Sequence, residues 1–323
     1  MKQAFVITIC LAVGLMVWSA PDAVNPAETA KPAVNAPVSP TDTAPITSTY
    51  LLRPLFDINK IIAVEEEQQW EGTHTINPGE KPETYPFLRH TKHNYTEHIL
   101  MMAGDHRSIH SQRTYTYSHL RTNIPGEGRK DQVVSLQDRT LRLEAMDYHI
   151  VKIDKIAPKD GVIIAEDYDY VSALNWFYLL LPQEPLAVGQ TYPLNSQKVA
   201  EIFFRNSYNE KLCKAVGSGT LESKIEYEGL PCLKTTLSLK LTRDDPSDNT
   251  VIEYEFSGNY IVSLEKKVIA DLELSGSFVL NHTTQAANGK KKVAVKTECN
   301  VINKLKLREV IEEKPAVEKT PAK

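Results

Sequence analysis

The sequence lacks the features that mark several common classes of protein. Cysteine is scarce, because only Cys213, Cys232 and Cys299 remain once the first 19 residues are set aside. Three thiols form at most one disulfide, which excludes a disulfide-stapled scaffold and leaves open whether Cys213 and Cys232 pair. Charge of one sign is also missing, since 37 basic and 41 acidic residues give a net charge of −4. This balance argues against a nucleic-acid-binding surface.

Catalytic and cofactor motifs are missing as well. No phosphate-binding glycine loop and no dinucleotide fingerprint are present. Gly217-Ser218-Gly219 lacks the rest of a nucleophile elbow, and we expect it to be a loop before a strand. Glu166, Asp167 and Asp169 could pair as catalytic carboxylates, but they also stand where a helix N-terminus favours negative charge. We therefore expect no enzymatic activity and no cofactor.

Only one long apolar run is present, at the N-terminus. Ala4 to Trp18 carries no charge, follows Lys2, and precedes small residues. As a helix this run would span about 22 Å, less than the roughly 30 Å of a bilayer core. The pattern predicts a signal peptide over residues 1–19, cleaved after Ser19. We expect the mature protein to be soluble, and secreted or periplasmic.

Two terminal segments have a composition that does not support a core. Residues 20–48 are mainly Ala, Pro, Val, Thr and Asn, and residues 311–323 are similar in character. Such segments are typical of disordered tethers and tails. Between them, residues 49–310 are enough for one large β-domain or for two coupled halves.

The last third of the chain alternates between apolar and polar residues. The alternation covers residues 233–242, 271–280 and 292–307, and turn-forming residues separate these stretches. A period of two predicts strands with one buried face, and the turns predict antiparallel hairpins. Gly258, inside a further stretch of this kind, is expected to mark a bulge or a tight bend.

The remaining chain adds further strands and two helices. The strand candidates are Lys60–Ile76, Thr84–Leu100, His106–Ile124, Gln132–Leu143 and Tyr148–Ile153. Residues 166–181 open with acids, become apolar and end at Pro182, which predicts a helix; a second helix is expected over Ser196–Phe204, capped by Asn195. The predicted fold is mainly β (α+β): a large antiparallel curved sheet or half-barrel, in two β-rich halves (49–165 and 185–310) joined by the helix over 166–181.

The junction after the first helix resembles a known motif. Leu181 to Tyr192 reads LPQEPLAVGQTY. This is similar to the LPxxPVxVGxTW junction in a family of secreted bacterial β-rich proteins of uncharacterised function, with Leu186 and Tyr192 replacing the usual Val and Trp. The resemblance implies a β-rich fold over most of residues 50–309. By architecture alone, the expected fold also resembles the periplasmic lipoprotein carriers, which bind acyl chains on a concave sheet face.

Histidine is concentrated in one part of the chain. Six of the nine histidines lie between residues 90 and 119. Of these, His106 and His110 share one strand face, as do His90 and His98, so two such pairs could converge on a Zn²⁺ or Cu²⁺ ion. No His-x-His or His-Glu-x-x-His spacing supports this site, and solvated polar strand faces explain the same pattern.

An acidic loop is a second metal candidate. Asp244, Asp245, Asp248 and Asn249 could bind Ca²⁺, but Asn249 occupies the position where an EF-hand-like loop needs glycine. A tight hairpin turn accounts for the same residues.

The apolar end of the first expected helix suggests a ligand site. Trp176, Phe177 and Leu180 could line a lipid-binding concavity, or they could fill the core of the sheet. Our hypothesis is an exported, non-catalytic β-protein that binds a hydrophobic ligand, a lipoprotein or an envelope partner. The alternative is a structural or interaction protein of the envelope without a small ligand, with a histidine-cluster metal-binding protein as a third possibility. An apolar cavity between helix and sheet would favour the first.

Overall fold

The computed structural model describes residues 48–52, 58–77, 81–104, 107–158, 162–247, 249–265, 269–285 and 292–310. The expected signal peptide, almost all of the expected tether and the expected tail lie outside the described residues.

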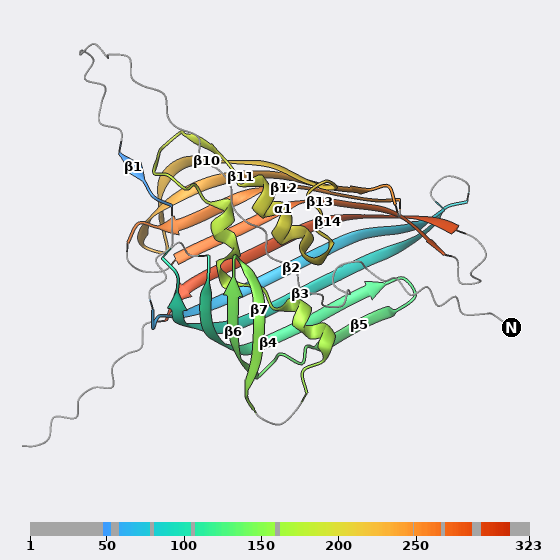
Figure 1. Cartoon of the computed structure of the whole chain (residues 1–323), viewed down its shortest axis with the longest axis horizontal. Coiled ribbons are helices and arrows are strands. Elements are labelled where there is room, and N and C mark those ends of the chain that lie inside the picture. Colours follow the sequence, from blue (N-terminus) through green and yellow to red (C-terminus); the bar gives the residue numbers. More distant parts are fainter. Residues whose placement is uncertain are drawn as a thin grey trace, which may run out of the picture.

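The chain folds mainly as one antiparallel sheet, as the alternation predicted. The sheet has 12 strands in the order β7-β6-β4-β3-β2-β14-β13-β12-β11-β10-β9, and β5 pairs with β4 beside β6 (Figure 1). The strands are β2 (Ile61–Ile76), β3 (Glu83–Met102), β4 (Ile109–Ile124), β5 (Gly128–Val133), β6 (Thr140–Met146), β7 (His149–Ala157), β9 (Thr191–Pro193), β10 (Cys213–Tyr227), β11 (Leu230–Asp245), β12 (Thr250–Ser263), β13 (Ile269–Gln285) and β14 (Lys292–Glu309). Two short strands, β1 (Thr49–Tyr50) and β8 (Leu186–Ala187), pair separately.

The first and last long strands lie side by side. Strand β14 pairs with β2 along most of its length, and Val301 lies opposite Trp70. This pairing joins the N-terminal strands to the C-terminal strands, so the two expected halves form one continuous sheet.

Alternation along the strands gives the sheet two different faces. Leu233, Leu237, Leu239 and Leu241 are at most 4% exposed, whereas Lys240 between them is exposed. The covering segment, residues 165–207, lies over the buried side (Figure 1), which we call the helix-bearing face; the other is the polar face. Burying each large apolar side chain contributes about 1.5–3 kcal/mol to folding.

The covering segment differs from the predicted helix over residues 166–181. It contains two 3-10 helices, η1 (Ala165–Tyr170) and η2 (Leu174–Leu180), and the backbone of Val171 and Ala173 between them is extended. The prediction of one continuous helix was therefore wrong. Asp, Asn, Ser and aromatic residues have low helix propensity, and burial of most of η2 lets packing decide its conformation.

The second helix was predicted correctly. Helix α1 (Ser196–Phe204) begins after Asn195, whose side chain accepts a hydrogen bond from the backbone N–H of Lys198 at 3.2 Å. A 3-10 turn, η3 (Arg205–Ser207), follows it. None of the described helices is long and apolar enough to cross a membrane.

Two strand boundaries were also predicted wrongly. Gln132–Leu143 is divided between β5 and β6 by a turn in which Asp138 has a φ of 59°. Gly217-Ser218-Gly219 lies inside β10 and not in a loop, opposite Leu237–Leu239. A Cβ on Gly219 would lie 2.3 Å from Cζ of Tyr192, the last residue of the LPQEPLAVGQTY stretch, so glycine lets this ring pack against β10.

Of the two roles expected for Gly258, a bulge or a tight bend, the structure contradicts the bulge. The pairing of β12 with both neighbours continues through Gly258 without a register shift. A Cβ at this position would lie 1.8 Å from the backbone oxygen of Glu273, and the same holds for Gly276 and the oxygen of Glu255. These glycines permit a close approach of neighbouring strands, as glycine does where sheets curve.

The three cysteines among the described residues form no disulfide. Cys213, Cys232 and Cys299 are free and buried, and burial raises the pKa of the Cys299 thiol to about 12. Cys299 packs as a small apolar side chain, as its alternating neighbours indicated.

Candidate functional site

The three apolar residues predicted as ligand contacts lie in η2. Phe177 and Leu180 are 1% and 2% exposed and belong to the core. Trp176 is half-buried, and its ring centroid lies 6.4 Å from that of Phe203 in α1. Of the three, Trp176 is the one that a ligand could reach without displacing the core.

The candidate metal ligands are spread over the polar face. His90 Nε2 lies 2.8 Å from Glu67 and His110 Nε2 lies 3.7 Å from Glu144, whereas His98 stands opposite Ile61. His106 lies outside the described residues. In the part of the chain that the structure describes, no three His, Cys, Asp or Glu side chains are grouped so that they could hold a metal ion.

The acidic candidates have structural contacts. In the 244–249 turn, the Asp245 carboxylate accepts hydrogen bonds from the backbone N–H of Ser247 at 3.1 Å and from Arg243 Nη2 at 2.6 Å. Asp248 lies outside the described residues. Asp167, in the first turn of η1, accepts a hydrogen bond from the backbone N–H of Ser135 at 2.7 Å. The turn interpretation thus accounts for Asp245, and Asp167 ties η1 to the loop between β5 and β6.

A buried ionic cluster lies beneath the covering segment. Arg113 on β4 is fully buried, and its Nε donates to Glu97 on β3 at 2.5 Å. Its Nη1 donates to the Tyr115 hydroxyl at 3.2 Å, and its Nη2 donates to the backbone oxygen of Ser172 at 2.9 Å. The Ser111 hydroxyl donates to Glu97 as well. The pair is therefore well hydrogen-bonded, which is the condition under which a buried ion pair is tolerated.

A second carboxyl group borders this cluster. Glu66 on β2 is 8% exposed, and the hydroxyl of Tyr95 lies 3.5 Å from its Oε2. Burial raises the pKa of Glu66, although the charges of Arg113 and Arg205 act to lower it. Burial disfavours the ionised form of a carboxyl group, and nearby cations favour it.

His93 and Ser118 form a buried pair next to Glu66. His93 Nδ1 lies 2.8 Å from Ser118 Oγ, and burial together with the charge of Arg113 lowers the pKa of His93 to about 4. A serine beside a histidine can be a nucleophile and its base, but Ser118 is 0% exposed and a base of pKa about 4 is poorly matched to neutral pH. His93 Nε2 has no hydrogen-bond partner among the described residues. The pair fits the interior of the sheet and not a reaction site.

Aromatic rings connect the covering segment to the sheet. We call the residues of this group the aromatic strip: Trp176, Phe203, Tyr254, Trp70 and Phe278. Successive ring centroids lie 6.4, 6.3, 6.0 and 4.9 Å apart in that order. Tyr254 and Phe278 are buried, whereas Trp70, Trp176 and Phe203 are half-buried. The strip therefore presents three partly accessible aromatic side chains from three different elements.

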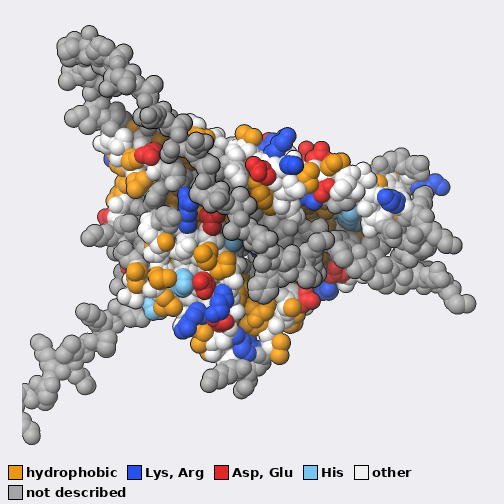
Figure 2. Space-filling view, in the orientation of Figure 1, with side chains coloured by type: hydrophobic (Ala, Val, Ile, Leu, Met, Phe, Trp, Pro, Cys, Tyr) orange, Lys and Arg blue, Asp and Glu red, His pale blue; other side chains and the backbone are white. Residues whose placement is uncertain are grey.

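The sheet beside the strip is also partly accessible. Gln68 on β2 is exposed, and Arg89 on β3 and Asn303 on β14 are half-buried, although Thr91 and Val301 on the same face are buried. We call Gln68, Trp70, Arg89, Asn303, Trp176 and Phe203 the central patch. It is an accessible region in the middle of an otherwise buried face. On the side of the molecule drawn in Figure 2, basic and acidic side chains are interspersed and not separated by sign.

Two arginines lie at the edge of the central patch: Arg89 belongs to it, and Arg205 stands two residues after Phe203, another of its members. Arg89 lies opposite Trp70, and its guanidinium carbon is 5.4 Å from the ring centroid of Tyr170. Arg205 Nη1 donates to the backbone oxygen of Asp169 at 3.4 Å. Partial burial raises the pKa of Asp169, and the charges of Arg205 and Arg89 counteract that rise, so both cations lie near the same carboxyl group. Among the described residues, neither arginine forms an ion pair with a carboxylate.

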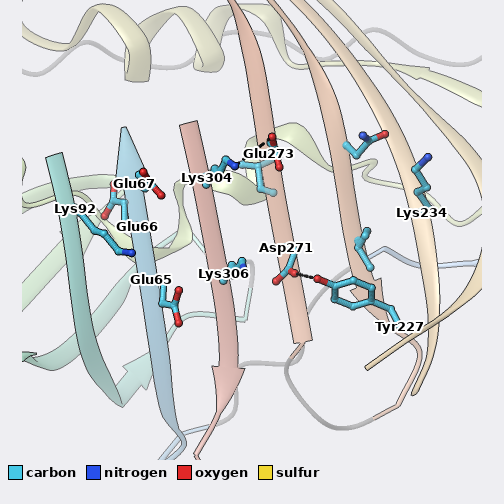
Figure 3. Close-up of a pocket in the computed structure, with 13 residues that line it drawn as sticks. Glu65, Glu66, Glu67, Lys92, Tyr227, Lys234, Asp271, Glu273, Lys304 and Lys306 are labelled. Atoms are coloured by element: carbon cyan, nitrogen blue, oxygen red, sulfur yellow. Dashed lines mark hydrogen bonds and ion pairs between the residues drawn. The ribbon is translucent and has the colours of Figure 1, made fainter. Parts of the chain in front are cut away.

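An open pocket of about 450 Å³ lies on the polar face (Figure 3). Lysines and acids alternate across its strands, in the register Lys92, Glu67, Lys304, Glu273. Lys304 lies 3.5 Å from Glu273. This alternation is an ordinary way of stabilising a solvated sheet face through cross-strand pairs. The pocket is therefore not the apolar cavity between helix and sheet that a hydrophobic ligand would need.

Several residues of the central patch were not identified from the sequence. Trp70 had a detectable signal, because it is the one aromatic residue in a strongly polar stretch of β2. Arg89 also had one, because it stands between Phe87 and Thr91 at positions that alternate into the buried face. Arg205 had none, since its position depends on how the covering segment folds back over the sheet.

Comparisons with known proteins give little further information. No family model matches the chain, and no curated protein matches it. Among solved structures, an outer membrane channel from Pseudomonas putida F1 aligns with 80% of this chain and 97% of its own, at 10% identity and a TM-score of 0.27. A likeness at this level carries no argument about fold or function.

Proposed function

We propose that this chain is an exported, non-catalytic protein that binds a hydrophobic ligand of acyl-chain type at the central patch. The observation that carries the proposal is the aromatic strip, whose accessible rings Trp70, Trp176 and Phe203 lie together in a face that is otherwise buried. Clustered accessible aromatic side chains in such a setting favour an apolar partner. The predicted signal peptide and the predicted secreted or periplasmic location support a ligand that comes from the cell envelope.

The location of tryptophan makes the proposal directly testable. The chain has three tryptophans, and one of them is Trp18 in the expected signal peptide. The other two, Trp70 and Trp176, both belong to the central patch. The intrinsic fluorescence of the mature protein therefore reports on this region alone.

The experiment is a titration of the mature protein with a long-chain fatty acid brominated near the middle of the chain. Bromine quenches tryptophan at contact distance, so we expect saturable quenching of both tryptophans. Trp70→Phe and Trp176→Phe each leave one reporter, and each should still be quenched. Absence of quenching, with an unchanged melting temperature at the highest ligand concentration, would overturn the proposal.

That negative outcome would support the second candidate, a structural or interaction protein of the envelope without a small ligand. The close packing of Phe177 and Leu180 in the core favours this alternative, because η2 then serves to fill the sheet. Fluorescence separates the two functions. If the protein is purely structural, the brominated fatty acid has no binding site near either tryptophan and causes no saturable quenching.

A further inference from the structure

We propose that the ligand carries an anionic head group, a carboxylate or a phosphate, and that Arg89 and Arg205 bind it at the edge of the central patch. This inference rests on the proposed function, because it assigns the polar end of the same ligand. It follows from the placement of two arginines beside an apolar binding surface.

The first observation is the state of the two guanidinium groups. Arg89 has a contact with the ring of Tyr170, and Arg205 has one hydrogen bond to a backbone oxygen. Neither forms a carboxylate ion pair among the described residues, whereas Arg113, Arg243 and Arg308 all do. Arginine has five donors in a planar fork that matches carboxylate and phosphate oxygens. Among the residues that the structure describes, most of these donors on Arg89 and Arg205 have no partner.

The second observation is the backbone of Arg205. This residue follows helix α1 with φ 41° and ψ −119°, a conformation that glycine adopts in type II′ turns and that other residues rarely adopt. A strained non-glycine residue persists where its side chain is needed or where the surroundings impose the conformation. The side chain of Arg205 donates to the backbone oxygen of Asp169 in η1, and its charge also acts on Glu66 of strand β2, so the strained position holds a cation between the covering segment and the sheet.

The third observation is the charge around the site. Glu66 and Asp169 interact electrostatically with Arg205, and Asp169 also interacts with Arg89. Burial raises the pKa of both carboxyl groups, and the charge of Arg205 acts to lower both. Arg113, the third cation of this region, is already paired with Glu97. An incoming anion would therefore meet two cations that are only partly compensated.

The position of Arg89 fixes how such a ligand would lie. Arg89 and Trp70 are direct cross-strand partners, so their side chains start within about 5 Å of each other. A head group on Arg89 places the following apolar chain over Trp70 and along the aromatic strip. The ligand class is a single-chain amphiphile with one anionic end.

The test uses three brominated probes with the same chain: a fatty acid, an alkyl phosphate and a fatty alcohol. Quenching of Trp70 and Trp176 measures the Kd for each. We expect at least one anionic probe to bind tenfold or more tighter than the alcohol, because only an anion forms charge-assisted hydrogen bonds with the guanidinium groups. The carboxylate and phosphate probes distinguish the two sources of the anion.

Variants then assign the effect to the two arginines. Arg89→Gln and Arg205→Gln should each weaken the preferred anionic probe about tenfold and leave the alcohol unchanged, and Arg89→Lys should recover part of the loss. Arg121→Gln, an exposed arginine on the polar face of β4, is the matched control and should change neither Kd.

The outcomes separate this inference from the proposed function. Equal binding of acid, phosphate and alcohol, unaffected by either arginine variant, would overturn the anionic head group and leave the apolar site in place. Failure of all three probes to quench would overturn the apolar site itself. Circular dichroism of each variant confirms that the sheet has formed before a loss of binding is interpreted.

Discussion

The guanidinium group of Arg113 donates a hydrogen bond to the backbone oxygen of Ser172 at 2.9 Å, and this contact joins the centre of the sheet to the covering segment. Ser172 lies in the extended stretch between η1 and η2, where the predicted helix is interrupted. One side chain therefore satisfies the buried carboxylate of Glu97 and also fixes the path of the chain above it.

Replacing Arg113 by Ala should destabilise the protein by about 3–5 kcal/mol, because Glu97 would remain buried without a counter-ion. Urea denaturation at pH 7 measures this difference. The double variant Arg113→Met/Glu97→Leu should lose less than Arg113→Ala alone, since it removes both charges. Arg121→Ala on the polar face is the control and should lie within about 0.5 kcal/mol of the wild type. A small effect of Arg113→Ala would show that the cluster does not hold the covering segment.

The close strand contacts at glycine lead to a second prediction. Gly258→Ala should destabilise the protein by about 1–3 kcal/mol or more, because the new Cβ meets the backbone oxygen of Glu273. Gly104→Ala is the matched control: a Cβ on Gly104 meets nothing within 4 Å, so its melting temperature should be nearly unchanged. Equal melting temperatures for both variants would mean that the curvature at Gly258 relaxes easily.

The sequence predicted the sheet more successfully than it predicted the covering segment. Strands such as β11 and β13 were predictable because each alternates polar and apolar residues. In the structure, most of the apolar residues of these strands are buried. The covering segment was harder because the conformation of η2 depends on what it packs against and not on its own propensities. Its acids and apolar residues correctly indicated a helical element. The interruption at Ser172 could not be predicted locally, because Ser172 is hydrogen-bonded to Arg113, 59 residues earlier in the chain.

The candidate site was only partly predictable for a related reason. Trp176 was identified because it stands in a conspicuous apolar run. The residues that make it accessible, Trp70 and Phe203, come from β2 and α1, and their proximity depends on the fold. The histidines were conspicuous in sequence, yet His90 and His98 lie eight residues apart on one strand, which separates them by about 26 Å.

The buried His93 predicts a pH dependence of stability. Its pKa is about 4 in the folded protein, against 6.5 for an unperturbed histidine. Between these values the unfolded chain binds a proton that the folded chain does not, so stability falls as the pH falls from 6.5 toward 4. Between pH 7 and pH 5 this group should cost about 2 kcal/mol of unfolding free energy.

His93→Gln removes this contribution. In urea denaturation, the unfolding free energy should therefore decrease between pH 7 and pH 5 by about 2 kcal/mol less in the variant than in the wild type. Glu66 contributes with the opposite sign, because burial raises its pKa and ionisation then costs stability as the pH rises. Both proteins contain Glu66, so the comparison isolates His93. If His93→Gln keeps the full wild-type decrease in unfolding free energy between pH 7 and pH 5, burial does not disfavour protonation of His93 in the folded state.

The backbone of Arg205 predicts opposite effects on stability and on binding. Arg205→Gly and Arg205→Ala both remove the guanidinium group, so both should weaken an anionic amphiphile to the same extent. Only glycine relieves the backbone at φ 41° and ψ −119°, so Arg205→Gly should be about 1 kcal/mol more stable than Arg205→Ala in urea denaturation. If the glycine variant is also at least as stable as the wild type while binding is lost, the strained residue is kept for its side chain. If the alanine and glycine variants are equally stable, the turn after α1 adapts to either residue, and the backbone no longer supports a binding role for Arg205.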